Sequence, residues 1–155
     1  MANNYTSASF VIPVKDAEVT RQRMKALEEW MHSQDDAALQ SFGDKAAVVA
    51  KALAEQLEQG ALGFAWDLEG GTQGGTLGLF HDETIDMEAA VTVAQLLLDL
   101  DDNDAVCSAT WADTCSKPRV DEFGGGAVVF DRHRAEWQST YTASEELRKR
   151  FGGTR

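Results

Sequence analysis

Cysteine and proline are both scarce in this 155-residue sequence, which holds two of each. Two cysteines, Cys107 and Cys115, are too few for the disulfide framework of a small secreted domain or for a four-ligand zinc site. On one continuous strand their spacing would separate them by roughly 26 Å, so a bridge would need the chain to fold back. We therefore expect both to remain thiols in a cytoplasmic protein.

Long apolar runs are also missing. No stretch reaches the roughly 18 apolar residues that a membrane helix needs. The N-terminal sequence MANNYTSASF lacks the basic start and the apolar core of a signal peptide. The sequence therefore predicts no membrane contact. With 43% hydrophobic residues the chain is long enough for one core, so we expect a single domain over 1–155 with loose termini at about 1–6 and 152–155.

Basic residues are missing from the middle of the chain. From Ala52 to Ser116 there is no Lys or Arg, and the net charge of the chain is −12, beyond the roughly 2 to 8 charges that keep a small domain soluble. Such segregated charge argues against direct binding of nucleic acid and favours a basic protein partner. The 13 carboxylates of this segment are Glu55, Glu58, Asp67, Glu69, Asp82, Glu83, Asp86, Glu88, Asp99, Asp101, Asp102, Asp104 and Asp113.

Hydrophobic periodicity and turn signals predict the element order β-α-α-β-β-α-β-β-α. Asp16 is placed to cap the first helix and Ser144 the last one. The predicted fold class is α+β: an antiparallel sheet of four to five strands with helices on one face, in a ferredoxin-like split βαβ arrangement with additions. The expected elements are a strand at 10–14, a helix starting near 16, a helix at 45–58, a hairpin over 63–81, a helix at 86–100, a hairpin of strands 105–114 and 126–132, and a short final helix.

Two groups of acidic side chains are the candidates for binding a basic partner. In the segment GFAWDLE, apolar residues alternate with Asp67 and Glu69, so both carboxylates should leave the uncovered face of the sheet, with Asp113 as a third member. The second group stands at the C-terminal end of the helix at 86–100, where the helix dipole disfavours negative charge by about 0.3 to 1 kcal/mol. Folding offers no reason for this second group, which comprises Asp99, Asp101, Asp102 and Asp104.

The segment WADTCSKPRVDEFGGGAVVF contains the last candidate. Its three glycines lead into a strand and not into a helix, which argues against a phosphate-binding loop. A long hairpin connection is the better interpretation, and Phe123 beside the glycines is a candidate exposed anchor for a partner. The tryptophans Trp30, Trp66, Trp111 and Trp137 are expected in the core or half-buried, and any that is exposed would be an interface anchor.

Motifs for catalysis or metal binding are incomplete. The segment DLDDND opens like a calcium loop, but Asp104 stands where the loop needs glycine and Thr110 where it needs the bidentate glutamate. A hydrolytic metal site of Asp67, Glu69 and His81 is conceivable, although a histidine at a strand end near solvated carboxylates explains the same pattern. We therefore expect no catalytic residues, no metal and no cofactor.

These observations favour a non-enzymatic acidic protein that inhibits or neutralises a basic, nucleic-acid-binding partner by nucleic-acid mimicry. Anti-CRISPR, anti-restriction and immunity proteins from mobile elements are of this physical type. The alternatives are the small metal-dependent hydrolase just described and an acidic housekeeping or structural domain whose charge serves only solubility. A homodimer through an unpaired strand edge is also left open.

Overall fold

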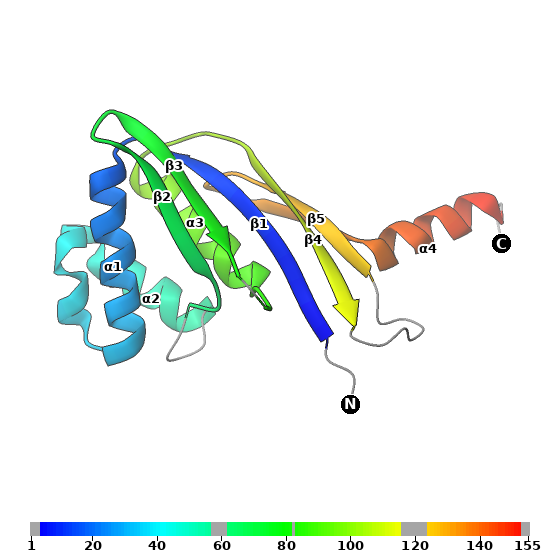
Figure 1. Cartoon of the computed structure of the whole chain (residues 1–155), viewed down its shortest axis with the longest axis horizontal. Helices are drawn as coiled ribbons and strands as arrows, with labels where there is room; N and C mark the ends of the chain where they lie inside the picture. Colours follow the sequence, from blue (N-terminus) through cyan, green and yellow to red (C-terminus); the bar gives the residue numbers. More distant parts are fainter. Residues whose placement is uncertain (1–3, 57–61, 82, 116–123, 153–155) are drawn as a thin grey trace.

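The computed structural model describes residues 4–56, 62–81, 83–115 and 124–152 (Figure 1). Its elements alternate in a pattern close to the predicted one, with one strand and one 3-10 segment added. In chain order they are β1 (Asn4–Val14), α1 (Ala17–Ser33), the 3-10 segment η1 (Asp36–Lys45), α2 (Ala46–Gln56), β2 (Ala65–Gly71), β3 (Gly74–Phe80), α3 (Met87–Leu100), β4 (Cys107–Cys115), β5 (Gly124–Phe130), β6 (Ala135–Ser139) and α4 (Thr140–Phe151).

The six strands form one antiparallel sheet in the order β2-β3-β1-β4-β5-β6. The first four follow the predicted split βαβ arrangement, because each helical crossover, from β1 to β2 and from β3 to β4, skips one neighbouring strand. The long central strand β1 pairs with β4 along Asn4–Ala8 and with β3 along Ser9–Val14. The prediction of an α+β fold with one antiparallel sheet is thus confirmed, and β5 and β6 are the additions.

Alternation along the strands decides which face of the sheet is covered. In β1, Phe10, Ile12 and Val14 are buried, whereas Val11 between them is 60% exposed. Residues directly opposite in an antiparallel pair share a face, so the face of Ile12 continues through Leu77 of β3 and Leu68 of β2. Figure 1 shows α1, α2 and α3 gathered on one side of the sheet, and α4 projecting beyond its end.

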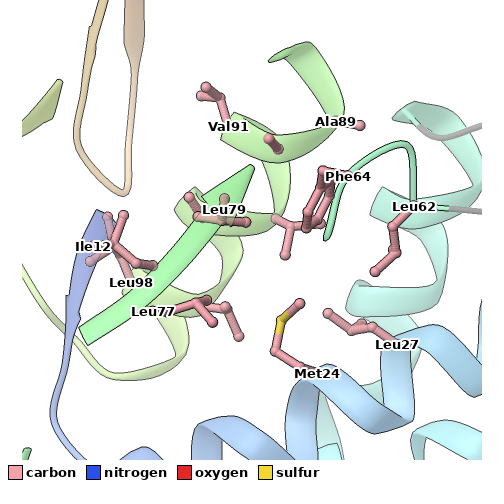
Figure 2. Packing of buried hydrophobic residues seen from close by; sticks show 14 of the residues in the cluster. Ile12, Met24, Leu27, Leu62, Phe64, Leu77, Leu79, Ala89, Val91 and Leu98 are labelled. Carbon is pink, nitrogen blue, oxygen red and sulfur yellow. The ribbon is translucent and has the colours of Figure 1, made fainter. Parts of the chain in front are cut away.

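The core lies between this covered face and the first three helices (Figure 2). Ile12, Leu77 and Leu79 of the sheet are fully buried, as are Met24 and Leu27 of α1. Burial of each such side chain stabilises the fold by about 1.5 to 3 kcal/mol relative to exposure. Of α3, eight residues are buried, in agreement with its nearly continuous apolar sequence. The core therefore belongs mainly to β1–β3 with α1 and α3.

Three details differ from the sequence expectations. β1 begins at Asn4, so residues 4–6 belong to the strand and not to a loose terminus. The sheet has a sixth strand, β6, where a loop was expected. The last helix begins at Thr140 and is capped by Ser139, whose side chain accepts a hydrogen bond from the backbone N–H of Thr142. Ser144, the predicted cap, therefore lies inside α4. In contrast, Asp16 caps α1 as predicted.

Candidate functional site

Asp67 and Glu69 point away from the helices, as the alternation in β2 predicts. Both are exposed, and their cross-strand partners on β3 are Gly78 and Thr76. The carboxylate of Asp67 lies over Gly78: a Cβ atom there would come within 2.4 Å of its Oδ1 atom. Among the described residues neither carboxylate takes part in an ion pair. They therefore lie on the uncovered face at one edge of the sheet without a compensating charge among the residues that the structure describes.

Asp113 lies on the opposite face, which corrects its predicted place beside Asp67. It is directly opposite Thr6 of β1 and Gly124 of β5, and Thr6 shares the face of the buried Phe10 by alternation. The Thr6 hydroxyl donates a hydrogen bond of 2.9 Å to Oδ1 of Asp113, which is half-buried. Asp113 thus accepts a hydrogen bond from the neighbouring strand β1 and is not part of the acidic surface around Asp67.

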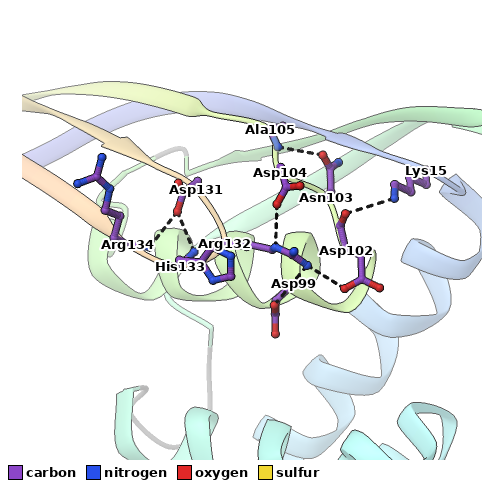
Figure 3. Close-up of polar contacts among 10 residues, drawn as sticks. All are labelled: Lys15, Asp99, Asp102, Asn103, Asp104, Ala105, Asp131, Arg132, His133 and Arg134. Carbon is purple, nitrogen blue, oxygen red and sulfur yellow. Dashed lines mark hydrogen bonds and ion pairs between the residues drawn. The ribbon is translucent and has the colours of Figure 1, made fainter.

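The acidic group after α3 surrounds an arginine from the turn between β5 and β6 (Figure 3). The guanidinium Nη1 atom of Arg132 lies 2.8 Å from Oδ1 of Asp102 and 3.8 Å from Oδ1 of Asp99. Its Nε atom lies 3.1 Å from Oδ1 of Asp104, an ion pair without hydrogen-bond alignment. The Arg132 side chain is only 18% exposed, whereas that of Asp102 is 85% exposed. One arginine therefore forms ion pairs with three carboxylates that face solvent.

Further contacts fix the loop that carries this cluster. Asp102 adopts a left-handed conformation (φ 48°), and the Asn103 side chain accepts a hydrogen bond from the N–H of Ala105 and donates one to the carbonyl of Pro13. Asp101 forms a separate ion pair with Arg23 of α1, at 2.7 Å. The loop is thus held to β1, to α1 and to the β5–β6 turn.

The ion pairs shift the acid–base equilibria of the cluster. The hydrogen bond from Arg132 and its positive charge lower the pKa of Asp102, and the same contact raises the pKa of Arg132. In the adjacent turn, backbone N–H groups of His133 and Arg134 donate to Asp131 and lower its pKa. Asp102, Asp131 and Arg132 therefore remain charged at neutral pH.

These contacts remove the reason for which the second acidic group was selected. Asp99, Asp101, Asp102 and Asp104 do have structural partners, so folding accounts for much of their presence. Four carboxylates are opposed by the guanidinium groups of Arg23 and Arg132 and by the ammonium group of Lys15, which donates a hydrogen bond of 3.5 Å to the backbone carbonyl of Asp102, so one net negative charge remains. The middle of the chain is therefore less uniformly negative in space than in sequence.

The remaining sequence candidates gain little from the structure. Phe123 lies outside the described residues. His81 follows the end of β3, three residues beyond the partner of Asp67, which is about 10 Å along a strand. Its Nδ1 atom accepts a hydrogen bond from the N–H of Glu83. Within the described ranges, no three His, Cys, Asp or Glu side chains gather as a metal site would require.

The cysteines stand at the two ends of β4. Eight residues of continuous strand separate their Cα atoms by about 26 Å, too far for a bridge between them. Cys107 is a buried free thiol whose pKa is raised by burial.

The sequence predicts an interface anchor at Trp137 if that side chain is exposed, but sequence reasoning missed the rest of a set of exposed apolar side chains around β5, β6 and α4. The ring of Trp137, 43% exposed, packs edge-on against Trp111 with 5.7 Å between ring centroids. Gly126 permits this contact, because a Cβ atom there would lie 2.4 Å from the Trp111 ring. A groove of about 340 Å³ runs between β5, β6 and α4. The exposed members of this set are Val129, Trp137, Tyr141, Leu147 and Phe151.

Comparison with protein-family models, with curated proteins and with solved structures finds no match for this chain. Across the portion of the chain that the structure describes, no helix combines the length and the apolar character needed to span a membrane.

Proposed function

We propose that this chain is a non-enzymatic binding protein that uses its acidic surface to neutralise a basic protein, of the kind that binds nucleic acid. The observation that carries the proposal is the pair Asp67 and Glu69, exposed on an uncovered sheet face without an ion-pair partner in the described residues. Neither carboxylate caps a helix or takes part in an ion pair among the described residues, although charge on an edge strand also opposes pairing with another chain. A role in association explains their presence.

The strand also suits these carboxylates to recognition. Residues two apart on a strand lie about 7 Å apart on the same face, and β2 is held in register by β3 along its whole length. The two charges are therefore spaced by a rigid backbone, so a partner does not have to order them on binding. Spaced carboxylates of this kind can occupy the positions where a basic groove expects phosphates.

The cluster around Arg132 supports this surface at longer range. Glu69 is opposite Thr76, which is opposite Pro13, and the carbonyl of Pro13 accepts the hydrogen bond from Asn103. The residual negative charge of the loop thus lies at the same end of the sheet as Glu69. Exposed charge of one sign accelerates encounter with an oppositely charged partner, and salt weakens this effect within a Debye length of about 8 to 10 Å.

The test uses affinity capture from a lysate of the native host, with three forms of the full chain at equal concentration. The first is the wild type, the second carries Asp67→Asn with Glu69→Gln, and the third carries Glu29→Gln with Glu55→Gln. Glu29 and Glu55 are exposed carboxylates on α1 and α2, so the two variants have the same net charge. A short DNA duplex is then added to the captured proteins as a competitor.

The proposal expects nucleic-acid-binding proteins to be retained by the wild type and by the Glu29/Glu55 control, and to be released by the duplex. The Asp67/Glu69 variant should lose them while its free energy of unfolding stays within about 0.5 kcal/mol of the wild type. Equal loss in both variants would mean that only net charge matters. If the Asp67/Glu69 variant retained the same proteins, Asp67 and Glu69 would not be part of the interface.

A further inference from the structure

β6 is the last strand in the sheet order, and no other described strand pairs with its outward backbone groups. The N–H of Asp131 donates to the carbonyl of Arg134 across the β5–β6 turn, which makes these two residues a hydrogen-bonded pair. Because such pairs alternate along an antiparallel ladder, Glu136 and Gln138 direct their backbone groups to β5. The N–H and C=O groups of Ala135 and Trp137, and the N–H of Ser139, therefore point to the open edge, whereas the C=O of Ser139 belongs to the first turn of α4.

The helix that follows β6 is equally unpartnered. None of the 12 residues of α4 is buried, and Phe151 and Leu147, four residues apart on one side of the helix, are 97% and 58% exposed. Isolated helices shorter than about 12 to 15 residues are marginal in water, because most helices in proteins are stabilised by packing an apolar face. α4 thus has the properties of a helix that packs against another molecule.

Charge indicates which molecule this is. The last turn of α4 carries Arg148, Lys149 and Arg150, of which Arg148 pairs with Glu145 of the same helix at 3.3 Å, in a chain whose net charge is −12. The other end of β6 leads back to Arg132 and the acidic cluster around it, whose carboxylates face solvent and which retains one net negative charge after Arg23, Arg132 and Lys15 are counted. The basic helix and the acidic cluster therefore lie beyond opposite ends of the same edge strand.

We propose that two copies of this chain pair through their β6 strands, antiparallel and about a two-fold axis at Trp137. Antiparallel pairing brings the start of α4 in one copy beside the β5–β6 turn of the other. Figure 1 shows α4 leaving the sheet beyond its end, so each helix continues past the acidic end of the second copy. Lys149 and Arg150 lie about 14 to 15 Å along α4 from its first residue, where their long side chains can approach Asp102 or Asp104 of that copy.

The register follows from the outward groups of β6. With Trp137 opposite its own symmetry mate, Ala135 is opposite Ser139 of the second copy. The two Trp137 residues then form a hydrogen-bonded pair, and the N–H of Ser139 donates to the C=O of Ala135 in the second copy. Glu136 is then opposite Gln138. A shift of one residue would place Glu136 opposite Glu136 of the second copy, and directly opposed like charges destabilise a sheet. The preferred register also places the two exposed tryptophans at the centre of the interface, where aromatic anchors contribute most.

The first experiment measures the dimer dissociation constant by sedimentation equilibrium of the full chain at low and high salt. One variant carries Arg148→Glu, Lys149→Glu and Arg150→Glu. Its control carries Arg21→Glu, Lys25→Glu and Lys51→Glu, which changes the net charge equally on α1 and α2. The proposal expects a wild-type dimer that salt weakens, a rise in dissociation constant of about tenfold or more in the α4 variant, and at most a twofold change in the control. A monomeric wild type, or equal weakening by both variants, would overturn it.

The second experiment tests the pairing itself, independently of charge. A mixture of two chains, one with Glu136→Cys and the other with Gln138→Cys, is mildly oxidised. In the proposed register these residues form a non-hydrogen-bonded pair with Cα atoms about 4.5 Å apart, within the range of a disulfide. The mixture should form disulfide-linked dimers more readily than either chain alone or a control with Val48→Cys on α2, which is 66% exposed. A yield equal to that of the controls would exclude this interface. Neither experiment depends on the proposed binding of a basic partner.

Discussion

The two edges of the sheet are built differently. At the β2 edge, Trp66 donates a hydrogen bond to Glu28 of α1, and the outward face carries Asp67 and Glu69. At the β6 edge, Trp137 is 43% exposed, and α4 leaves the domain without covering it. Charged side chains on an edge strand oppose pairing with another chain. The two edges therefore differ in that the β2 edge carries charges that oppose pairing, whereas the β6 edge carries an exposed tryptophan and remains available for association.

The same contrast runs through the core. Ile12, Leu77 and Leu79, on the strands nearest to β2, are completely buried. On β5, Val128 is buried whereas its neighbour Val129 is 48% exposed, because the helices cover only one face. Folding stability is thus expected to reside in β1–β3 with α1 and α3. Substitutions in the β6–α4 segment are therefore expected to change the free energy of unfolding of a monomer only slightly.

The largest effect should come from truncating the core at β3. Leu77→Ala should lower the free energy of unfolding by about 2 to 5 kcal/mol, because it removes buried methyl groups and leaves a cavity. Leu147→Ala on α4 removes the same atoms from a side chain that is 58% exposed. It should cost less than about 0.5 kcal/mol when measured at a concentration where the chain is monomeric. Urea unfolding of both variants checks the difference, and comparable losses would contradict the division of the molecule into these two regions.

A smaller effect is expected from removing the arginine that links the β5–β6 turn to the acidic cluster. Asp102 has a lowered pKa in the folded state, so its contact with Arg132 stabilises the fold above its unfolded pKa of about 3.8. That stability is lost as the pH falls through the folded pKa. In Arg132→Gln the pKa of Asp102 should return toward 3.8, and the acid dependence of stability below about pH 4 should become flatter.

Carboxyl resonances followed by NMR during an acid titration measure this change directly. Asp131 is the internal control, because backbone N–H groups and not Arg132 are the main cause of its lowered pKa. The two carboxyl groups should therefore respond differently to Arg132→Gln. An unchanged pKa of Asp102 would show that the contact with Arg132 does not persist in solution.

The features that depend on local pattern could be predicted from the sequence. Alternation in GFAWDLE correctly placed Asp67 and Glu69 on the exposed face, and Asp16 was recognised as a helix cap. β4 was harder, since small or apolar residues such as Ala109, Trp111 and Ala112 occur at both parities. Its alternation therefore did not reveal that Asp113 faces the other way.

Features that depend on distant residues could not be predicted. Arg132 meets Asp102 across 30 positions of sequence, and no local signal connects them. β6 could not be predicted either, because its sequence AEWQS contains only one large apolar residue and therefore shows no alternation of apolar and polar residues. The exposure of Trp137 also follows only from the sheet order, which makes β6 the last strand. Hydrophobic periodicity therefore could not predict the exposed tryptophan that distinguishes the β6 edge from the β2 edge.

Amide hydrogen exchange across a range of protein concentrations tests the contrast between the edges most directly. The account predicts that the backbone amides of Ala135, Trp137 and Ser139 become more protected as the concentration rises, because their outward N–H groups find carbonyl partners on a second copy. The amides of β2 should show the same protection at every concentration. If the β6 amides exchange at one rate throughout the range, or if β2 gains protection equally, the two edges do not differ in the way proposed.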